Sequence, residues 1–157
     1  MYDNTDAQGF PAIAFGVRSR LYAFQQRGTA TLLPWLQRYA GASPAPSLPQ
    51  WCLGLLNVRG TVQMAVDLGN LLGHGPSDTT ESSRLIFIEH GLAQLGLLVD
   101  SEIGVRTLMP NNLPEDAFGG PFATSSAMLE SHPVTVLDGS AIIRHVAKQL
   151  DAPIYII

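Results

Sequence analysis

The chain has 157 residues, of which 46% are hydrophobic and 14% charged, so it can bury a core and is too apolar to be disordered. A lone cysteine excludes an internal disulfide framework. The longest apolar stretches, such as residues 95–99, are far shorter than the roughly 20 residues that cross a bilayer. Residues 1–9 are polar and lack the basic and apolar segments of a secretory signal. We therefore expect a soluble cytoplasmic protein with no direct membrane insertion.

The charges are divided unequally between the two halves of the chain. The formal net charge is −4, which argues against nucleic acid as a partner. No aspartate or glutamate occurs between Ala7 and Val66, and the cations of that half are all arginines, since Lys148 is the only lysine. Arginine is enriched at protein interfaces and lysine is depleted. This pattern fits a surface that docks other proteins, and scattered, solvated arginines explain it equally well.

Short runs of apolar, β-branched and aromatic residues, bounded by Gly, Asp or Pro, predict strands along most of the chain. The expected strands are residues 13–17, 20–24, 51–58, 61–66, 84–89, 92–99, 103–108 and 134–137. So many short strands without long crossover helices indicate small sandwiches or barrels rather than a parallel sheet.

Two helices are expected between these strands and after them. A short one follows Asp67, at residues 68–72. A longer one is predicted at residues 140–150, with either Asp138 or Ser140 as its N-cap. One face of this helix collects four apolar residues at helical spacing: Ile143, Val146, Ala147 and Leu150.

Segments rich in Pro, Gly and Ser predict loops at residues 37–50, 73–83 and 110–127. Residues 1–12 are expected to form a flexible N-terminus, and residues 13–157 a single domain. The last residues, Ile154 to Ile157, are too apolar for a free tail. They either pair as an edge strand or dock on another surface, and an oligomer is one consequence of such a sticky edge.

Three apolar runs each end in an aspartate. They are MAVDL at residues 64–68, LLVDS at 97–101 and TVLDG at 135–139. Aspartates at strand ends accept backbone N–H groups and cap turns, and this is the favoured interpretation. A pair of carboxylates that act as general acid and base is the alternative.

No other pattern predicts catalysis or metal binding. Cys52 lies in an apolar strand, where a cysteine is typically a small buried hydrophobe. The four histidines share no ligand spacing. No glycine-rich run forms a phosphate-binding loop. We therefore expect neither a catalytic residue nor a metal or cofactor.

The segment from Leu48 to Leu72 carries the strongest signal, because it predicts two strands joined at Arg59-Gly60. Asn57 suits the first position of a type I turn that ends at Gly60, or else Arg59 and Gly60 form a two-residue hairpin loop by themselves. In both cases Arg59 stands at a rigid hairpin tip. A preorganised guanidinium is a strong docking group, although a solvated turn arginine is the alternative.

This segment resembles the chemotaxis coupling protein (CheW) family, whose hallmark is P-x-W-x-x-G-x-x-N-x-R-G followed by V-D-L. The matching residues are Pro49, Trp51, Gly54, Asn57, Arg59 and Gly60, then Val66, Asp67 and Leu68. The later runs RLIFIE, LGLLVD and TVLDGSAII are similar to the family's second set of strands and to the start of its closing helix. The resemblance covers roughly residues 13–150.

The resemblance implies an all-β fold of two small five-stranded SH3-like barrels that share a core, with a short C-terminal helix. These interleaved β-subdomains would make up one CheW-like domain over residues 13–157. It also implies a non-catalytic signalling adaptor and scaffold of a two-component chemotaxis or surface-motility pathway. Its partners would be the cytoplasmic tip of a methyl-accepting chemoreceptor and the regulatory domain of a histidine kinase.

By the same resemblance, the receptor-facing turn and its flanks would be Leu56, Asn57, Val58, Arg59 and Gly60. Leu53 and Val62 would line the adjoining core or groove.

The sequence departs from the family pattern at two places. Residues 29–36, TATLLPWL, lack the acidic residue of a V-x-E-V strand, and Pro34 interrupts a strand there. Met64-Ala65 replaces the Pro-containing step of V-V-P-V-V-D. These departures indicate an altered partner, as in a pilus system. Two alternatives stay open: an array-assembly module without receptor coupling, and a small-molecule-binding β-barrel with a closed apolar pocket.

Overall fold

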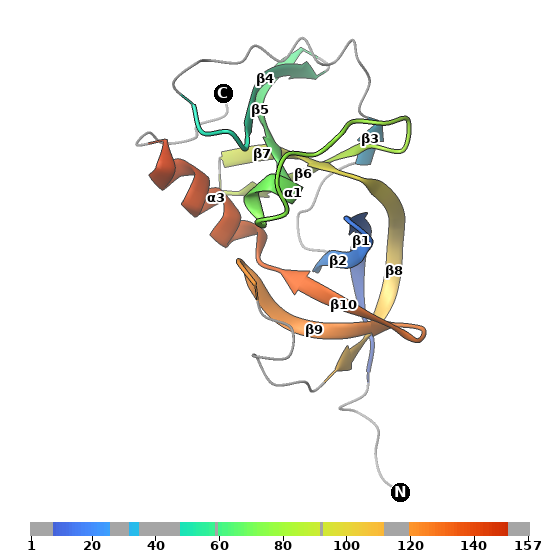
Figure 1. Cartoon of the computed structure of the whole chain (residues 1–157). Helices are drawn as coiled ribbons and strands as arrows, with labels where there is room; N and C mark the ends of the chain where they lie inside the picture. Colours follow the sequence, from blue (N-terminus) through green and yellow to red (C-terminus); the bar gives the residue numbers. More distant parts are fainter. Residues whose placement is uncertain are drawn as a thin grey trace, which may run out of the picture.

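The computed structural model describes residues 8–25, 32–34, 48–58, 60–91, 93–111 and 120–150. Within these ranges the chain forms two five-stranded units and two helices, α1 (Leu68–Leu71) and α3 (Gly139–Gln149). Figure 1 shows the two units stacked one above the other, with α3 on one side and β8 on the opposite side. The predicted all-β fold with a short C-terminal helix is confirmed.

The first unit is a closed barrel with the strand order β1-β2-β10-β9-β8. Its strands are β1 (Phe10–Val17), β2 (Arg20–Gln25), β8 (Ser101–Asn111), β9 (Ala123–Leu129) and β10 (His132–Leu137). Its interior is lined by Ala12, Ala14, Ala23, Leu108, Ala127, Val134 and Val136. So many small side chains leave room for a narrow barrel to close.

The second unit is a five-stranded sheet with the order β3-β6-β7-β5-β4. Its strands are β3 (Leu32–Pro34), β4 (Cys52–Val58), β5 (Thr61–Asp67), β6 (Arg84–His90) and β7 (Ala93–Val99). Pro34 belongs to β3, whereas the sequence predicted that it breaks a strand. β3 lies at the end of the described strand order, and an edge strand tolerates a proline.

The two units repeat one pattern of pairing. In each, an antiparallel hairpin, β1–β2 or β6–β7, is joined in parallel to a third strand, β10 or β5. β5 ends at Asp67, and Asp138 directly follows β10; each of these aspartates is the N-cap of the helix that follows. The runs TVLDG and MAVDL therefore mark equivalent strand ends in the two units.

The main error of the sequence prediction is β9, which lies in a segment expected to be a loop. The strand is ATSSAML, which has few β-branched or aromatic residues, but Ser126 and Ala127 are buried in the barrel. Pairing with β8 and β10 therefore decides its conformation. The other predicted strands are present with shifted ends. β1 already begins at Phe10, and β8 continues to Asn111.

A shared core fills the space between the two units. The barrel contributes Phe15, which stacks on Phe24 with ring centroids 5.5 Å apart. The sheet contributes Val66, Ile86, Leu95 and Leu97, and α3 contributes Ile142, Ile143 and Val146. Each large apolar side chain buried in this way stabilises the fold by roughly 1.5–3 kcal/mol. Ile142, which the helical spacing did not single out, is fully buried and widens the apolar face of α3.

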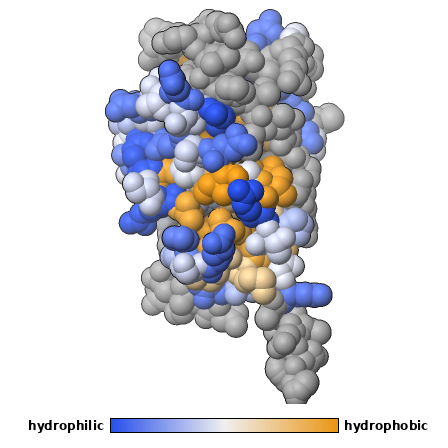
Figure 2. All heavy atoms as spheres, turned by 90° about the vertical axis from the view of Figure 1, so that its right-hand side faces the viewer, coloured by the Kyte–Doolittle hydropathy of each residue, from blue (hydrophilic) through white to orange (hydrophobic). Residues whose placement is uncertain are grey.

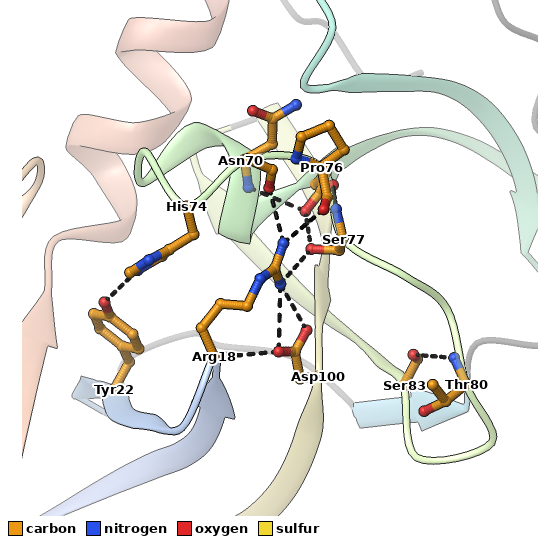
Figure 3. A network of polar contacts seen from close by, with 11 residues as sticks. Arg18, Tyr22, Asn70, His74, Pro76, Ser77, Thr80, Ser83 and Asp100 are labelled. Atoms are coloured by element: carbon orange, nitrogen blue, oxygen red, sulfur yellow. Dashed lines mark hydrogen bonds and ion pairs between the residues drawn. The ribbon is translucent and has the colours of Figure 1, made fainter.

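Arg18 joins the two units through polar contacts (Figure 3). It lies in the two-residue loop between β1 and β2, with the φ of 51° that such a loop requires. Its guanidinium donates to the carbonyls of Gly75 and Pro76, both at 2.8 Å, and to Ser77 Oγ at 2.9 Å. It also pairs with Asp100 at 3.3 Å. The loop at residues 73–83 is thereby held against the barrel.

Asp67 completes this arrangement from the end of β5. Its carboxylate accepts hydrogen bonds from the Ser77 hydroxyl at 2.6 Å and the Ser77 N–H at 2.8 Å. Gly69 gives the groups room, because a Cβ there would lie 2.8 Å from Ser77 Oγ and 3.0 Å from Arg18 Nη1. A side chain at this position would force the network apart.

We predict that Arg18→Ala lowers the free energy of unfolding by about 1–3 kcal/mol, because several partly buried acceptors lose their donor. Arg106→Ala is the matched control, since Arg106 is exposed and donates to the neighbouring carbonyl of Val105. Urea unfolding of both variants measures the difference. An equal decrease in the free energy of unfolding in the two variants would show that Arg18 does not join the units.

Asp138 caps α3 with its carboxylate. Burial alone would raise its pKa, but hydrogen bonds from the Ser140 hydroxyl and the Ala141 N–H, helped by nearby Arg144, hold the pKa below its ordinary value. A carboxyl whose pKa is lower in the folded state adds stability above its unfolded pKa. That stability is lost as the pH falls through the folded value.

Asp138→Ala should therefore lower the free energy of unfolding by about 1 kcal/mol at neutral pH, the usual effect of losing an N-cap. The difference from the unmodified chain should begin to shrink as the pH falls below about 4, the ordinary aspartate pKa, and should disappear only below the lowered pKa of the folded state. Asp78→Ala, at an exposed position of the loop at residues 73–83, serves as the control. A difference that stays constant down to acid pH would contradict the capping role.

Candidate functional site

The strand-end aspartates are structural. Asp67 caps α1 and holds Ser77, and Asp138 caps α3. Asp100 accepts the backbone N–H of Arg18 at 2.7 Å. The predicted turn-capping role is confirmed, and it leaves these carboxylates engaged rather than arranged as an acid–base pair.

Cys52, Tyr22 and His74 are also packed or hydrogen-bonded. Cys52 is buried, and burial raises the pKa of its thiol, against a smaller lowering by the Gly54 N–H. Burial also raises the pKa of Tyr22, partly opposed by the charge of Arg20, and the Tyr22 hydroxyl lies 3.0 Å from His74 Nε2. The described residues include no group of three His, Cys, Asp or Glu side chains placed to hold a metal. They include no helix able to span a bilayer.

The β4–β5 hairpin has the geometry that the motif predicts. Val58 pairs with Thr61, so the connection is two residues long, and Gly60 has a φ of +84°. The N–H of Gly60 donates to Asn57 Oδ1 at 2.9 Å. The register favours the two-residue loop, and the Asn57 side chain braces it. Arg59 lies outside the described residues.

The predicted site residues fall into two environments. Asn57 and Gly60 are exposed at the end of the hairpin. Leu56 is 1% exposed and packs in the core of the second unit, where Leu53 also packs. Val58 is the last residue of β4. The hairpin therefore presents Asn57 and Gly60 directly, whereas Leu56 supports it from inside.

An apolar surface lies beside this turn. Leu55, Asn57, Val62 and Met64 share one face of the hairpin, as cross-strand partners in the register, and are called the hairpin patch below. Leu55 is 49% exposed and Val62 is 53% exposed. Val62 was expected to line a groove. Leu55 was not among the expected binding residues, because the run CLGLLNV does not alternate in polarity and so does not separate the exposed Leu55 from the buried Leu56.

A second apolar surface lies on β8 and is called the β8 patch below. Val105 is 55% exposed and Met109 is 41% exposed, and their spacing of four residues places them on one face of the strand. Val105 is the cross-strand partner of Ile13, which is buried in the shared core. Figure 2, which faces the side of β8, shows an apolar area bordered by hydrophilic surface. No sequence pattern predicted this patch.

A pocket of about 460 Å³ opens between the units near the start of α3. Phe24, Ile88 and Leu137 are among the apolar residues that line it. Four of its polar lining residues, Glu89, Thr124, Asp138 and Ser140, make hydrogen bonds within the fold, which leaves Gln25 and His90. The pocket therefore offers few free polar groups to orient a small molecule.

Comparison with known proteins places the chain in a family. The CheW-like domain profile matches residues 11–147, so the chain belongs to the CheW-like domain family. It is 21% identical to the chemotaxis protein CheW of Bacillus subtilis over 150 residues, which cover 92% of this chain and 94% of that protein. It is 32% identical to a probable chemotaxis protein CheW of Rhizobium etli over 73 residues, or 46% of this chain. That match spans only about half of the relative, 47% of its length.

A solved structure has the same fold. The scaffolding protein TtCheW from Thermoanaerobacter tengcongensis superposes with a TM-score of 0.68 at 18% identity, over 84% of this chain and 89% of that one. These findings confirm the family resemblance, and the chain is an adaptor of the chemotaxis-coupling type, as the sequence predicts.

Proposed function

We propose that the chain is a non-catalytic adaptor that connects the cytoplasmic tip of a chemoreceptor to the regulatory domain of a histidine kinase. The supporting observation is the distribution of exposed apolar side chains. Among the described residues, the large exposed ones fall into two pairs: Leu55 with Val62 on the sheet, and Val105 with Met109 on the barrel. An adaptor that holds two partners at once needs two such surfaces, one for each.

The hairpin patch is the proposed receptor surface. Asn57 and Gly60 of the family motif lie at the end of this patch, so a polar turn stands next to the exposed Leu55 and Val62. The hydrogen bond from Gly60 to Asn57 fixes the turn before any partner arrives. A preorganised turn loses little conformational entropy on binding, and arginine is enriched among the residues that dominate binding energy.

The β8 patch is the proposed kinase surface. β8 pairs with β1 up to Leu108, which includes Val105, and with β9 from Met109 to Asn111, so each of the two exposed side chains projects from a paired part of the strand. The Arg84–Glu102 ion pair lies near the start of the same strand. An apolar face with charged neighbours is typical of interfaces that form and dissociate.

The small-molecule alternative has less support, because polar groups of the pocket are engaged in the fold. The array-assembly alternative would use the same fold and keep the contact with the kinase. It differs in one respect that can be measured, which is the absence of receptor binding.

The two-surface arrangement predicts separable defects. Val62→Asp should weaken binding of a receptor cytoplasmic fragment roughly 10-fold or more and leave kinase binding unchanged, and Val105→Asp should do the reverse. Arg59→Ala should likewise weaken receptor binding and leave kinase binding unchanged. Isothermal titration calorimetry with each purified partner measures these effects. Thr79→Asp, in an exposed polar loop, controls for the added charge.

A single variant that abolishes binding of both partners, while its circular dichroism stays native, would contradict two separate surfaces. Normal binding of both partners by all three variants would show that neither patch is a binding surface for the receptor or the kinase. Kinase binding without any receptor binding would favour the array-assembly module.

A further inference from the structure

We propose that the pocket at the start of α3 binds an arginine side chain that a partner protein inserts into it. The described lining residues of this pocket come from β2, β6, β9, β10 and the first turn of α3. None of them belongs to the hairpin patch or to the β8 patch. An occupant of the pocket therefore leaves both patches free, whichever partners those patches bind.

The two units share one topology, so the surroundings of the pocket have a counterpart in the other unit. Read from β8, the closed barrel has the order β8-β1-β2-β10-β9, which corresponds strand by strand to β3-β6-β7-β5-β4. The β9–β10 and β4–β5 hairpins each have a register shift close to their aspartate. The N–H of Asp138 donates to the carbonyl of Phe122 at 2.9 Å, and the N–H of Asp67 donates to that of Trp51 at 2.8 Å. Asp138 and Asp67 are therefore equivalent positions.

Beside Asp67, the chain fills the space with two of its own side chains. Leu68, the first residue of α1, is completely buried in the shared core. Arg18 reaches in from the β1–β2 loop (Figure 3), and its Nη1 lies so close to α1 that a Cβ on Gly69 would be 3.0 Å away. We call this arrangement the Arg18 site. It contains a guanidinium and a leucine next to a helix-capping aspartate.

The pocket has glycines at both equivalent positions. Gly139 directly follows Asp138, as Leu68 follows Asp67. Gly91 is the first residue of the two-residue β6–β7 loop, as Arg18 is in the β1–β2 loop, and the φ angles are 63° and 51°. The pocket of about 460 Å³ is therefore the space that an arginine and a leucine fill in the Arg18 site.

The walls of the pocket suit an arginine side chain. Phe24, Ile88 and Leu137 provide an apolar surface for its methylene stem. Among the described lining residues, two are carboxylates, Glu89 and Asp138, and none is a lysine or arginine. The pocket thus combines an apolar wall with acceptors for a cationic head group.

Both carboxylates can accept a further donor, although each is engaged in the fold. Asp138 accepts from the Ser140 hydroxyl at 2.7 Å and from the Ala141 N–H at 3.2 Å, both through Oδ1. Glu89 accepts from Gln94 at 3.0 Å through Oε2. Asp138 Oδ2 and Glu89 Oε1 therefore offer lone pairs to a ligand. A planar guanidinium, with several N–H donors, can reach two such oxygens at once.

The charge of the pocket favours an arginine within a polypeptide over the free amino acid. Free arginine would bring its own carboxylate beside Glu89 and Asp138, and no lysine or arginine among the described lining residues would pair with it. The backbone of an arginine inside a protein chain carries no such charge. The ligand is therefore a side chain presented by a partner protein.

An NMR titration with N-acetyl-arginine methylamide tests the pocket directly. The probe should cause saturable shifts in the amide signals of Leu137, Gly139 and Ser140. The signals of Leu55 and Val105 should stay unchanged and serve as the internal control. The lysine analogue should bind about 3-fold more weakly or worse, because it lacks the planar fork, and the uncharged citrulline analogue should cause no shifts.

Two variants block or weaken the pocket without disturbing the fold. Gly139→Leu places a leucine where the Arg18 site has one, and should abolish the shifts. A Cβ at this position lies 3.6 Å from Ile88 and 3.7 Å from Phe24, which is ordinary contact. Asp138→Asn keeps an N-cap but removes the charge, and should weaken binding about 5-fold. Asp78→Asn, at an exposed position, is its matched control.

Gly91→Arg supplies the guanidinium from within the chain. Arg18 already adopts the same left-handed backbone at the equivalent position, so the loop accepts an arginine. The introduced side chain should occupy the pocket and prevent the probe from binding. Gly91→Asn is the control, because asparagine tolerates this backbone conformation without a guanidinium, and it should bind the probe as the unmodified chain does.

Four results would overturn the proposal. The first is the absence of saturable shifts at the pocket, and the second is equal shifts with the citrulline analogue. The third is unchanged probe binding by both Gly139→Leu and Gly91→Arg, which would place the probe elsewhere. The fourth is binding of free arginine several-fold more tightly than the blocked probe, which would identify a small-molecule ligand instead of a partner's side chain.

Discussion

The shared apolar core between the two five-stranded units is the constraint on which the rest of the structure depends. Phe15 of the barrel, Leu97 of the sheet and Ile142 of α3 are buried in one cluster. Neither unit can bury alone the apolar face that it turns toward the other unit. The other unit and α3 together cover that face. The Arg18 network adds directional contacts at the edge of this core, which fix how the loop at residues 73–83 lies against the barrel.

The same core explains where the two exposed patches occur. Met64 and Ile13 both contact it, and from them the apolar faces continue outward to Val62 on the hairpin and to Val105 on β8. The patches are thus the parts of two core faces that extend beyond the other unit. Their positions on different units suit an adaptor, since a partner on one patch leaves the other free.

Strong local signals made much of the fold predictable from the sequence. Apolar runs such as β6 and β7, and the Asn57-Arg59-Gly60 turn, are recognisable without a structure. β9 was missed because ATSSAML is held in a strand by pairing and by the narrow barrel rather than by its own preference. In the predicted site, the sequence identified the turn but gave no sign that Leu56 is 1% exposed. The β8 patch depends on how the units are stacked, which no local pattern encodes.

Under the proposed function, one molecule holds a receptor and a kinase at the same time. The most direct measurement is the mass of the complex in solution, by sedimentation velocity, for this chain mixed with a chemoreceptor cytoplasmic fragment and a kinase regulatory domain. The account predicts a species that contains all three components at concentrations where both binary complexes also form. Two binary complexes that exclude each other, with no ternary species at saturation, would contradict it.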